Sequence, residues 1–270
     1  MKRLGYFALF AVMGLTGLRI YSQSAKPAHP SAPMIQAAAT PTSDDIDPAA
    51  VATLNKMGEY LRSLKSFQVV AEITRDEVLD NGQQVQFDSH IDMLARTPDR
   101  LRVEVNNANQ QRLYLYDGKN FTVWAERVNF YATVAAPPTI GKLTAALDDK
   151  YNLRLPLEDL FYWGTPQSKV GDIKTAIDVG PSEIGGVTCE HYVFHQEGLD
   201  WQVWIQQGDY PLPRKLVITT LTDDARPQYN AVLTWNLAPS FNEAAFEFNP
   251  PAGAQKIVLA AQQPASNDEK

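Results

Sequence analysis

Three side chains within one short segment have the chemistry to bind a metal or to act as a nucleophile. Cys189, His191 and His195 would point to the same side of an extended strand, because alternate residues share a face. One cysteine and two histidines can bind zinc, and a cysteine beside a histidine can be activated as a thiolate. A fourth ligand and an orienting acid are missing from the pattern. We therefore interpret Tyr192 and Phe194 as core residues, with the histidines facing water, and we expect no metal site here.

His90 is a second candidate, because it lies between Asp88 and Asp92 on the polar side of an expected strand. A hard cation could use such a trio, but three polar residues in this spacing are typical of a solvated strand face. The chain has no G-x-S-x-G, P-loop, G-x-G-x-x-G or H-E-x-x-H motif. We therefore expect no catalytic residues and no cofactor, in a protein that is not an enzyme.

Two pairs of neighbouring acids, Glu158-Asp159 and Asp148-Asp149, fall in segments with helical spacing. We expect these carboxylates to be solvated or to cap helices rather than to act as general acids. The chain of 270 residues has a formal net charge of -7, whereas nucleic-acid binding needs a basic face. We therefore expect no nucleic-acid partner and no docking on anionic lipid through charge alone.

The N-terminus has the layout of a secretory signal. Lys2 and Arg3 precede an apolar run from Leu4 to Leu18, which is short for a membrane span. We expect residues 1–24 to be a cleaved signal peptide, or an N-terminal anchor if the segment is retained. Residues 25–46 are rich in Ala, Pro, Ser and Thr and predict a tether. The predicted location is the periplasm, and the alternative is an inner-membrane anchor with the domain facing the periplasm.

A helix is predicted to start at Asp47-Pro48, since Asp is a good N-cap and proline suits the first helical position. Apolar residues recur at three- and four-residue steps up to Leu64, which predicts a helix that ends near Lys65. From Ser66 the hydrophobic period changes to two, which predicts strands.

Asn81-Gly82 between two alternating runs predicts a β-hairpin. A two-residue loop would place Ile73 opposite His90, so we predict an odd-length loop or one bulge that places Ile73 opposite Ile91. This arrangement puts both apolar sets on one face of the sheet. Further strands are expected at 101–105, 112–116, 121–125, 128–134, 174–179, 187–196, 201–206, 214–222 and 229–237. Such a series of short strands is typical of an antiparallel meander.

Residues 137–163 interrupt this meander with helical spacing, and Pro156 can open a second short helix. We interpret the segment as a helical insertion across an open face of the sheet. Several strands carry large apolar groups on both faces, which predicts either a filled core or an apolar cavity. The candidate ligand-binding residues are Leu143, Leu147, Leu157, Leu160, Phe161, Trp163, Trp124 and Trp204.

Four segments together resemble a family of predicted bacterial periplasmic proteins, domain of unknown function 2092. They are Leu64–Phe67, Tyr116–Lys119, Trp201–Ile205 with Pro211–Ile218, and Phe246-x-Phe248-x-Pro250-Pro251-x-Gly253. That family is similar to the LolA-like superfamily of lipoprotein carriers. The resemblance implies a mainly β (α+β) fold over residues 47–254, an unclosed antiparallel β-barrel whose N-terminal helix and helical insertion cover the concave face. Residues 255–270 are expected to form a flexible C-terminal tail.

The function that this resemblance implies is binding of an apolar ligand, which is a lipid, an acyl chain or a lipoprotein, by a carrier or an envelope sensor. The alternative is an envelope protein-protein interaction module with a packed barrel, no ligand and a protein partner. A metal- or thiol-dependent enzyme around Cys189 is a third hypothesis. Membrane contact is expected only through the N-terminal segment, if that segment is uncleaved.

Overall fold

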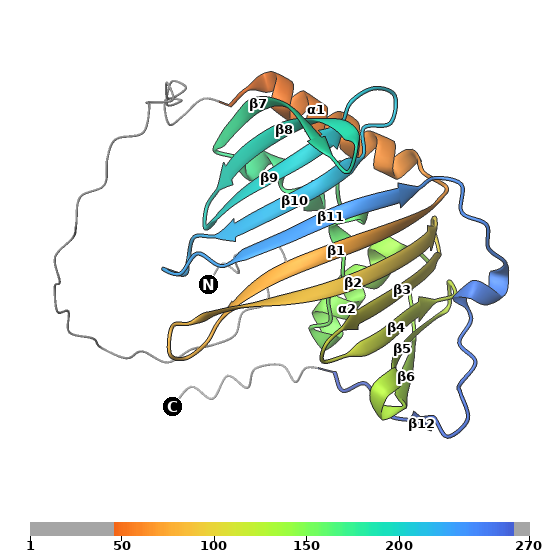
Figure 1. Ribbon diagram of the computed structural model, residues 1–270. Helices are drawn as coiled ribbons and strands as arrows, with labels where there is room; N and C mark the ends of the chain where they lie inside the picture. Colours follow the sequence, from red (N-terminus) through yellow and green to blue (C-terminus); the bar gives the residue numbers. More distant parts are fainter. Residues whose placement is uncertain (1–45, 262–270) are drawn as a thin grey trace, which may run out of the picture.

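One curved sheet dominates the computed structural model, which describes residues 46–261 (Figure 1). The strand order is β12-β6-β5-β4-β3-β2-β1-β11-β10-β9-β8-β7. Neighbouring strands are antiparallel except for β12 and β6, which are parallel. The first six strands are β1 Ser66–Val78, β2 Gln84–Arg96, β3 Arg100–Asn107, β4 Gln111–Tyr116, β5 Asn120–Ala125 and β6 Phe130–Ala135. The others are β7 Thr175–Ile184, β8 Val187–Gln196, β9 Leu199–Gln206, β10 Pro213–Thr220, β11 Gln228–Asn236 and β12 Gln255–Lys256. The sheet does not close on itself, because β12 and β7 lie at its two ends, so the predicted mainly β, unclosed antiparallel architecture is confirmed.

The N-terminal helix α1, Pro48–Ser63, begins where the sequence predicts. The side chain of Asp47 accepts a hydrogen bond from the Ala49 N–H at 2.8 Å, which satisfies one of the free donors of the first turn. The helix ends at Ser63, two residues before the predicted end. Its buried face consists of Ala50, Leu54, Met57, Gly58 and Leu61. Residues 1–45, which include the predicted signal and nearly all of the predicted tether, lie outside the described residues.

The hairpin of β1 and β2 has an odd-length loop, as predicted. Val78 lies opposite Gln84, and the Leu79 N–H donates to the Gln83 carbonyl at 2.8 Å. Gly82 has a φ of 80°, a conformation that glycine adopts without strain. The loop is therefore centred on Asn81.

The predicted pairing of Ile73 with Ile91 is wrong. Ile73 lies opposite Ser89, and Ile91 lies opposite Ala71, because the turn is centred one residue earlier than that pairing requires. This change moves the register by two residues, and side chains alternate with a period of two. The shared apolar face is therefore preserved: Ile91 and Met93 are buried on the same face as β1.

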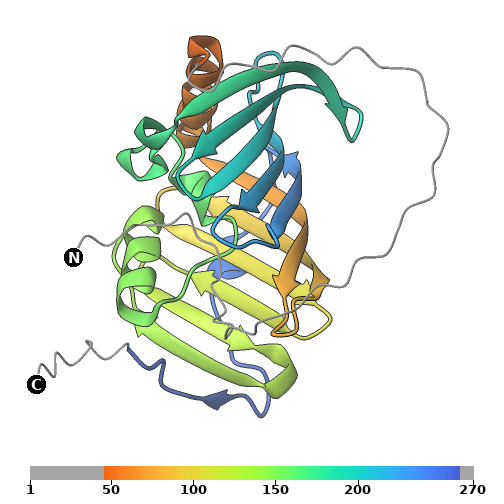
Figure 2. The same ribbon diagram turned by 90° about the vertical axis from the view of Figure 1, so that its left-hand side faces the viewer.

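The insertion between β6 and β7 lies on the same side of the sheet as α1 (Figure 2). It contains α2, Ile140–Tyr151, and the short 3-10 helices η2 Glu158–Phe161, η3 Pro166–Ser168 and η4 Val170–Asp172. The prediction that Pro156 opens a helix is wrong. Leu157 has a φ of 59°, and this left-handed residue separates Pro156 from η2. We call residues 153–173, from the end of α2 to the start of β7, the lid.

The main core lies between the concave face of the sheet and the helices. It joins α1, α2 and the lid to alternate residues of the strands, for example Val69, Met93, Val103 and Phe194. The helical insertion therefore covers the sheet as the sequence predicts.

The C-terminal segment covers part of the other face. Phe246, at the end of η5 Glu243–Phe246, is 1% exposed, and Phe248 packs its ring against Trp124 and Tyr131 with centroid distances of 6.1 and 5.0 Å. The chain then adds β12 to the edge strand β6, just beyond the predicted domain end at 254. The aromatic residues on the outer face of β5 and β6 thus pack against the chain itself rather than line a cavity. None of the helices between residues 46 and 261 is both long enough and apolar enough to cross a membrane.

Candidate functional site

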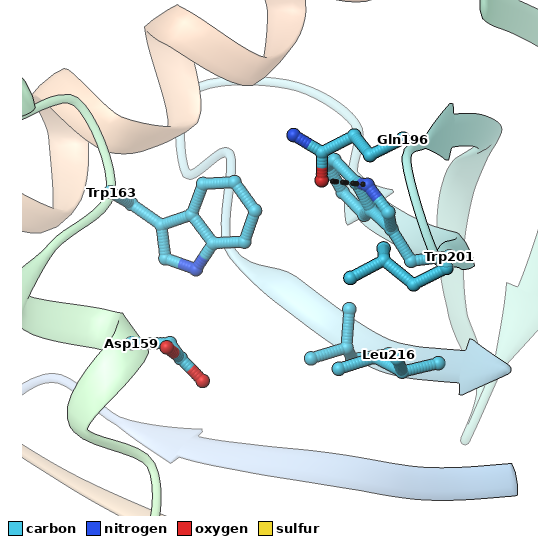
Figure 3. A pocket seen from close by; sticks show the side chains of 7 residues that line it. Asp159, Trp163, Gln196, Trp201 and Leu216 are labelled. Atoms are coloured by element: carbon cyan, nitrogen blue, oxygen red, sulfur yellow. Dashed lines mark hydrogen bonds between the residues drawn. The ribbon is translucent and has the colours of Figure 1, made fainter. Parts of the chain in front are cut away.

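Two adjoining cavities lie where the lid meets strands β9, β10 and β11 (Figure 3). Asp159, Trp163 and Leu216 line both of them. The larger has a volume of about 30 Å³, room for roughly two water molecules, and the smaller about 10 Å³. The larger cavity is otherwise lined by Leu157, Leu160, Val203, Pro213, Tyr229, Ala231 and Leu233. The smaller is otherwise lined by Gln196, Leu199, Trp201 and Ile218.

The wall formed by the sheet is held by a chain of hydrogen bonds. The Trp201 indole N–H donates to Gln196 Oε1 at 3.0 Å, and Gln196 Nε2 donates to the Lys169 carbonyl at 3.0 Å. Trp201 also packs against Trp163 of the lid, with ring centroids 5.4 Å apart. The polar groups of Gln196 are therefore engaged, and this part of the wall presents mainly apolar surface to the cavity.

Helix α1 holds the lid from behind. Arg62 Nη1 donates to the Trp163 carbonyl at 3.0 Å. Gly58 lies so close to the lid that a Cβ atom there would come within 2.6 Å of the Gly164 nitrogen. A side chain at position 58 would therefore push the lid away from α1.

Asp159 places a carboxylate in these apolar surroundings (Figure 3). Within residues 46–261, no side chain or backbone group donates a hydrogen bond to it. Arg154 is the cation that influences it, but the Arg154 guanidinium donates to Asp148 at 3.0 Å. Burial raises the pKa of Asp159 to about 6, against a lowering effect of Arg154. Burial and the nearby Asp159 charge raise the pKa of Tyr229, which lines the larger cavity.

Glu158, the neighbouring acid, points elsewhere. It is 6% exposed, and its Oε2 accepts a hydrogen bond from the Leu155 N–H at 3.1 Å. Burial raises the pKa of Glu158 to about 7. Glu158 therefore caps the lid turn, in line with the expectation of capping carboxylates. Asp159 lies in the first turn of η2, is partly exposed and also lines the two cavities. Asp149 is exposed, as expected.

The structure brings most of the sequence-predicted site residues together. Leu157, Leu160 and Trp163 line the larger cavity. Three others belong to the same core without lining the larger cavity: Leu143 and Leu147 are buried, and Phe161 is partly buried against the core.

Trp124 and Trp204 do not join this group. Trp124 contacts Phe248, and its indole N–H donates to Asn129 at 3.3 Å. Trp204 belongs to a separate small cluster with Cys189 and Val217. The physical reason is strand alternation, since Trp201 and Val203 take the inner face of β9 and Trp204 takes the outer one.

Several lining residues were missed in the sequence. Trp201 and Val203 could have been found from the period of two in β9, once one of them was assigned to the core. Leu216 and Tyr229 depend on which strands become neighbours, and Asp159 has no sequence signal that separates it from a solvated acid.

The side chains around Cys189 make the contacts that are typical of a β-strand: some pack in the core and others pair with the neighbouring strand. Tyr192 and Phe194 belong to the main core, so their interpretation as core residues is confirmed. His191 Nε2 lies 3.0 Å from Gln202 Oε1, and His195 Nδ1 lies 2.6 Å from Asp200 Oδ1. Over residues 46–261, no group of three or more His, Cys, Asp or Glu side chains is arranged to hold a metal ion.

His90 also pairs with a neighbouring strand. Its Nδ1 lies 2.7 Å from Glu72 Oε1 across the β1–β2 pair. Asp88 and Asp92 each contact a different residue of β1, Thr74 and Gln68. The trio therefore lies on an outer strand face whose polar groups pair across the hairpin.

Comparison with solved structures gives remote similarities. An uncharacterised conserved protein from Thermus thermophilus is 11% identical, with 78% of this chain and 99% of that chain covered and a TM-score of 0.46. The Mycobacterium tuberculosis lipoprotein LppX is 11% identical, with coverage of 73% and 100% and a TM-score of 0.38. A LolA superfamily protein from Nitrosomonas europaea is 12% identical, with coverage of 74% and 97% and a TM-score of 0.35. These comparisons identify no ligand for this chain.

Comparison with family models is more specific. No curated protein matches the chain. A family described as predicted periplasmic protein matches residues 50–260, which include the sheet, α1 and the lid. The periplasmic location predicted from the N-terminus agrees with this description. The chain therefore belongs to DUF2092, a family of predicted periplasmic proteins.

Proposed function

We propose that this periplasmic protein binds an apolar ligand between the lid and strands β9–β11, as a carrier or as an envelope sensor. The ligand is a lipid or an acyl chain, either free or attached to a lipoprotein. The observation that carries this proposal is the pair of adjoining cavities with largely apolar walls at the junction of lid and sheet. Ligand sites are typically concave and apolar with a few polar groups.

The lid must move for such a ligand to enter. Pockets for small ligands have volumes of about 300–1,000 Å³, whereas the larger cavity measures about 30 Å³. The lid consists of short 3-10 helices and connecting turns rather than long regular elements. We infer that this segment moves away from the sheet when a ligand enters, at the cost of exposing its buried apolar residues.

Burial of an acyl chain can supply the driving force. Each methylene transferred from water contributes about 0.8 kcal/mol, so ten methylenes contribute about 8 kcal/mol. This gain must exceed the cost of association and of separating Leu160 and Trp163 from the sheet. A long chain satisfies this condition more easily than a short one, so affinity should increase with chain length.

A cavity-filling variant tests the location of the site. Ala231 is 1% exposed and lines the larger cavity, so Ala231→Leu should fill the space that a ligand uses. Val232 is the next residue of β11 and is 37% exposed on the other face, so Val232→Leu is the matched control. We expect Ala231→Leu to weaken binding of a fluorescent long-chain alcohol at least about tenfold, a loss of about 1.4 kcal/mol, while Val232→Leu binds like the wild type.

Circular dichroism must show that both variants keep the fold. Equal binding by the two variants would mean that the alcohol binds elsewhere. If wild-type protein binds no long-chain amine, alcohol, fatty acid, lysolipid or lipopeptide, the proposal fails. The small cavity volume would then favour the interaction module with a packed barrel and a protein partner.

A further inference from the structure

The polar groups of the site are unequally satisfied. Gln196 and Trp201 bond to each other, and Gln196 also bonds to the lid backbone. The Asp159 carboxylate, in contrast, lines both cavities without a hydrogen bond from any residue between 46 and 261. In Figure 3 it projects from the lid toward the apolar side chains of the sheet, beside the ring of Trp163.

The Asp159 carboxylate is partly exposed and lines cavities with largely apolar walls. Transfer of an ion out of water without a partner is strongly unfavourable, so buried charges are normally paired. The guanidinium of Arg154 is bonded to Asp148, and the Asp159 charge contributes to raising the pKa of Tyr229 and of Tyr162. Asp159 is partly exposed, so its carboxylate is accessible to a ligand that enters the site.

A ligand can supply the missing partner. We propose that the apolar ligand of this site carries a cationic amine, which binds the Asp159 carboxylate while its hydrocarbon chain lies against Leu160, Val203 and Leu216. This inference rests on the proposed function and adds the chemical class of the ligand. Charge-assisted hydrogen bonds between an ammonium group and a carboxylate are among the stronger polar contacts in proteins.

The same geometry disfavours an acidic head group. A fatty acid bound in this orientation would place a second carboxyl group beside Asp159, and two close carboxyl groups cannot both be ionised without a large penalty. A neutral alcohol can donate one hydrogen bond to Asp159 but brings no charge. The expected order of affinity for ligands with the same chain is amine, then alcohol, then carboxylate.

Isothermal titration calorimetry of the full chain with decylamine, decanol and decanoate tests this order at neutral pH. Asp159→Asn keeps the size of the side chain but removes its charge. We expect this variant to bind decylamine roughly 10- to 100-fold more weakly, because hydrogen bonds to charged groups have that effect. Decanol affinity should stay within about twofold, which shows that the pocket is intact. Asp149→Asn, an exposed acid on α2, makes the same charge change away from the site and should behave like the wild type.

The outcomes separate this inference from the proposed function. If the three compounds bind with equal affinity, or decanoate binds best, the amine assignment is wrong and apolar-ligand binding stands. An unchanged decylamine affinity in Asp159→Asn, or an equal loss in Asp149→Asn, also overturns the assignment. If none of the three compounds binds the wild type, the proposed function itself fails.

Discussion

Glu158 should make the stability of the protein depend on pH in an unusual direction. The side chain is 6% exposed, and its pKa rises from the ordinary 4.5 to about 7 because burial disfavours the charged form. Between these two values the unfolded chain has an ionised Glu158, whereas the folded chain keeps it protonated. The folded state therefore binds more protons in this window, and stability falls as the pH rises from 4.5 toward 7.

The magnitude follows from the size of the shift. One pKa unit corresponds to about 1.4 kcal/mol, so the change from 4.5 to about 7 corresponds to about 3–4 kcal/mol at most. Asp159 contributes a further loss of stability as the pH rises, because burial raises its pKa from 3.8 to about 6. The free energy of unfolding should therefore be clearly larger near pH 4 than near pH 8, apart from the general effects of acid on other carboxylates.

Glu158→Gln removes this group while it keeps an oxygen that can accept the Leu155 N–H. We expect the variant to be more stable than the wild type by about 1–3 kcal/mol near pH 8 and nearly equal to it near pH 4. Urea unfolding followed by tryptophan fluorescence measures the difference at each pH. Glu197→Gln, the same change at an exposed position, is the control and should follow the wild-type profile. Parallel stability profiles for wild type and Glu158→Gln would refute the reasoning.

Two further predictions concern the packing around the site and on the opposite face. Gly58→Ala should destabilise the protein by about 1–3 kcal/mol and speed proteolysis of the lid, because the new Cβ would meet the Gly164 backbone at 2.6 Å. Gly141→Ala is in a helix with open space around it and should instead stabilise by up to about 1 kcal/mol, so thermal unfolding of both variants checks the contact. Phe246→Ala should cost about 3–5 kcal/mol in chemical denaturation, since the ring is 1% exposed. Ile257→Ala, at 48% exposure, should change stability by less than about 0.5 kcal/mol, and an equally small effect of Phe246→Ala would show that the C-terminal segment is not part of the fold.

Local patterns predicted much of the fold. The Asp47-Pro48 start of α1 and the position of the first hairpin follow from contacts between residues close in the chain, which the sequence specifies directly. The face of each apolar residue also follows from the period of two, which is why the shared face of β1 and β2 was predicted even though the pairing of Ile73 was wrong.

By itself, the sequence determined the helix start, the strand meander, the helical insertion and which lid residues face the sheet, because these depend on local periodicity and capping. Only the tertiary structure decided that Leu216 and Tyr229 lie opposite Asp159, because they come from strands β10 and β11, far from the lid in sequence. It also decided that Trp124 packs under the C-terminal segment, outside the pocket. The environment of Asp159 is set by side chains distant in sequence, and the burial that raises its pKa is a property of that assembled environment.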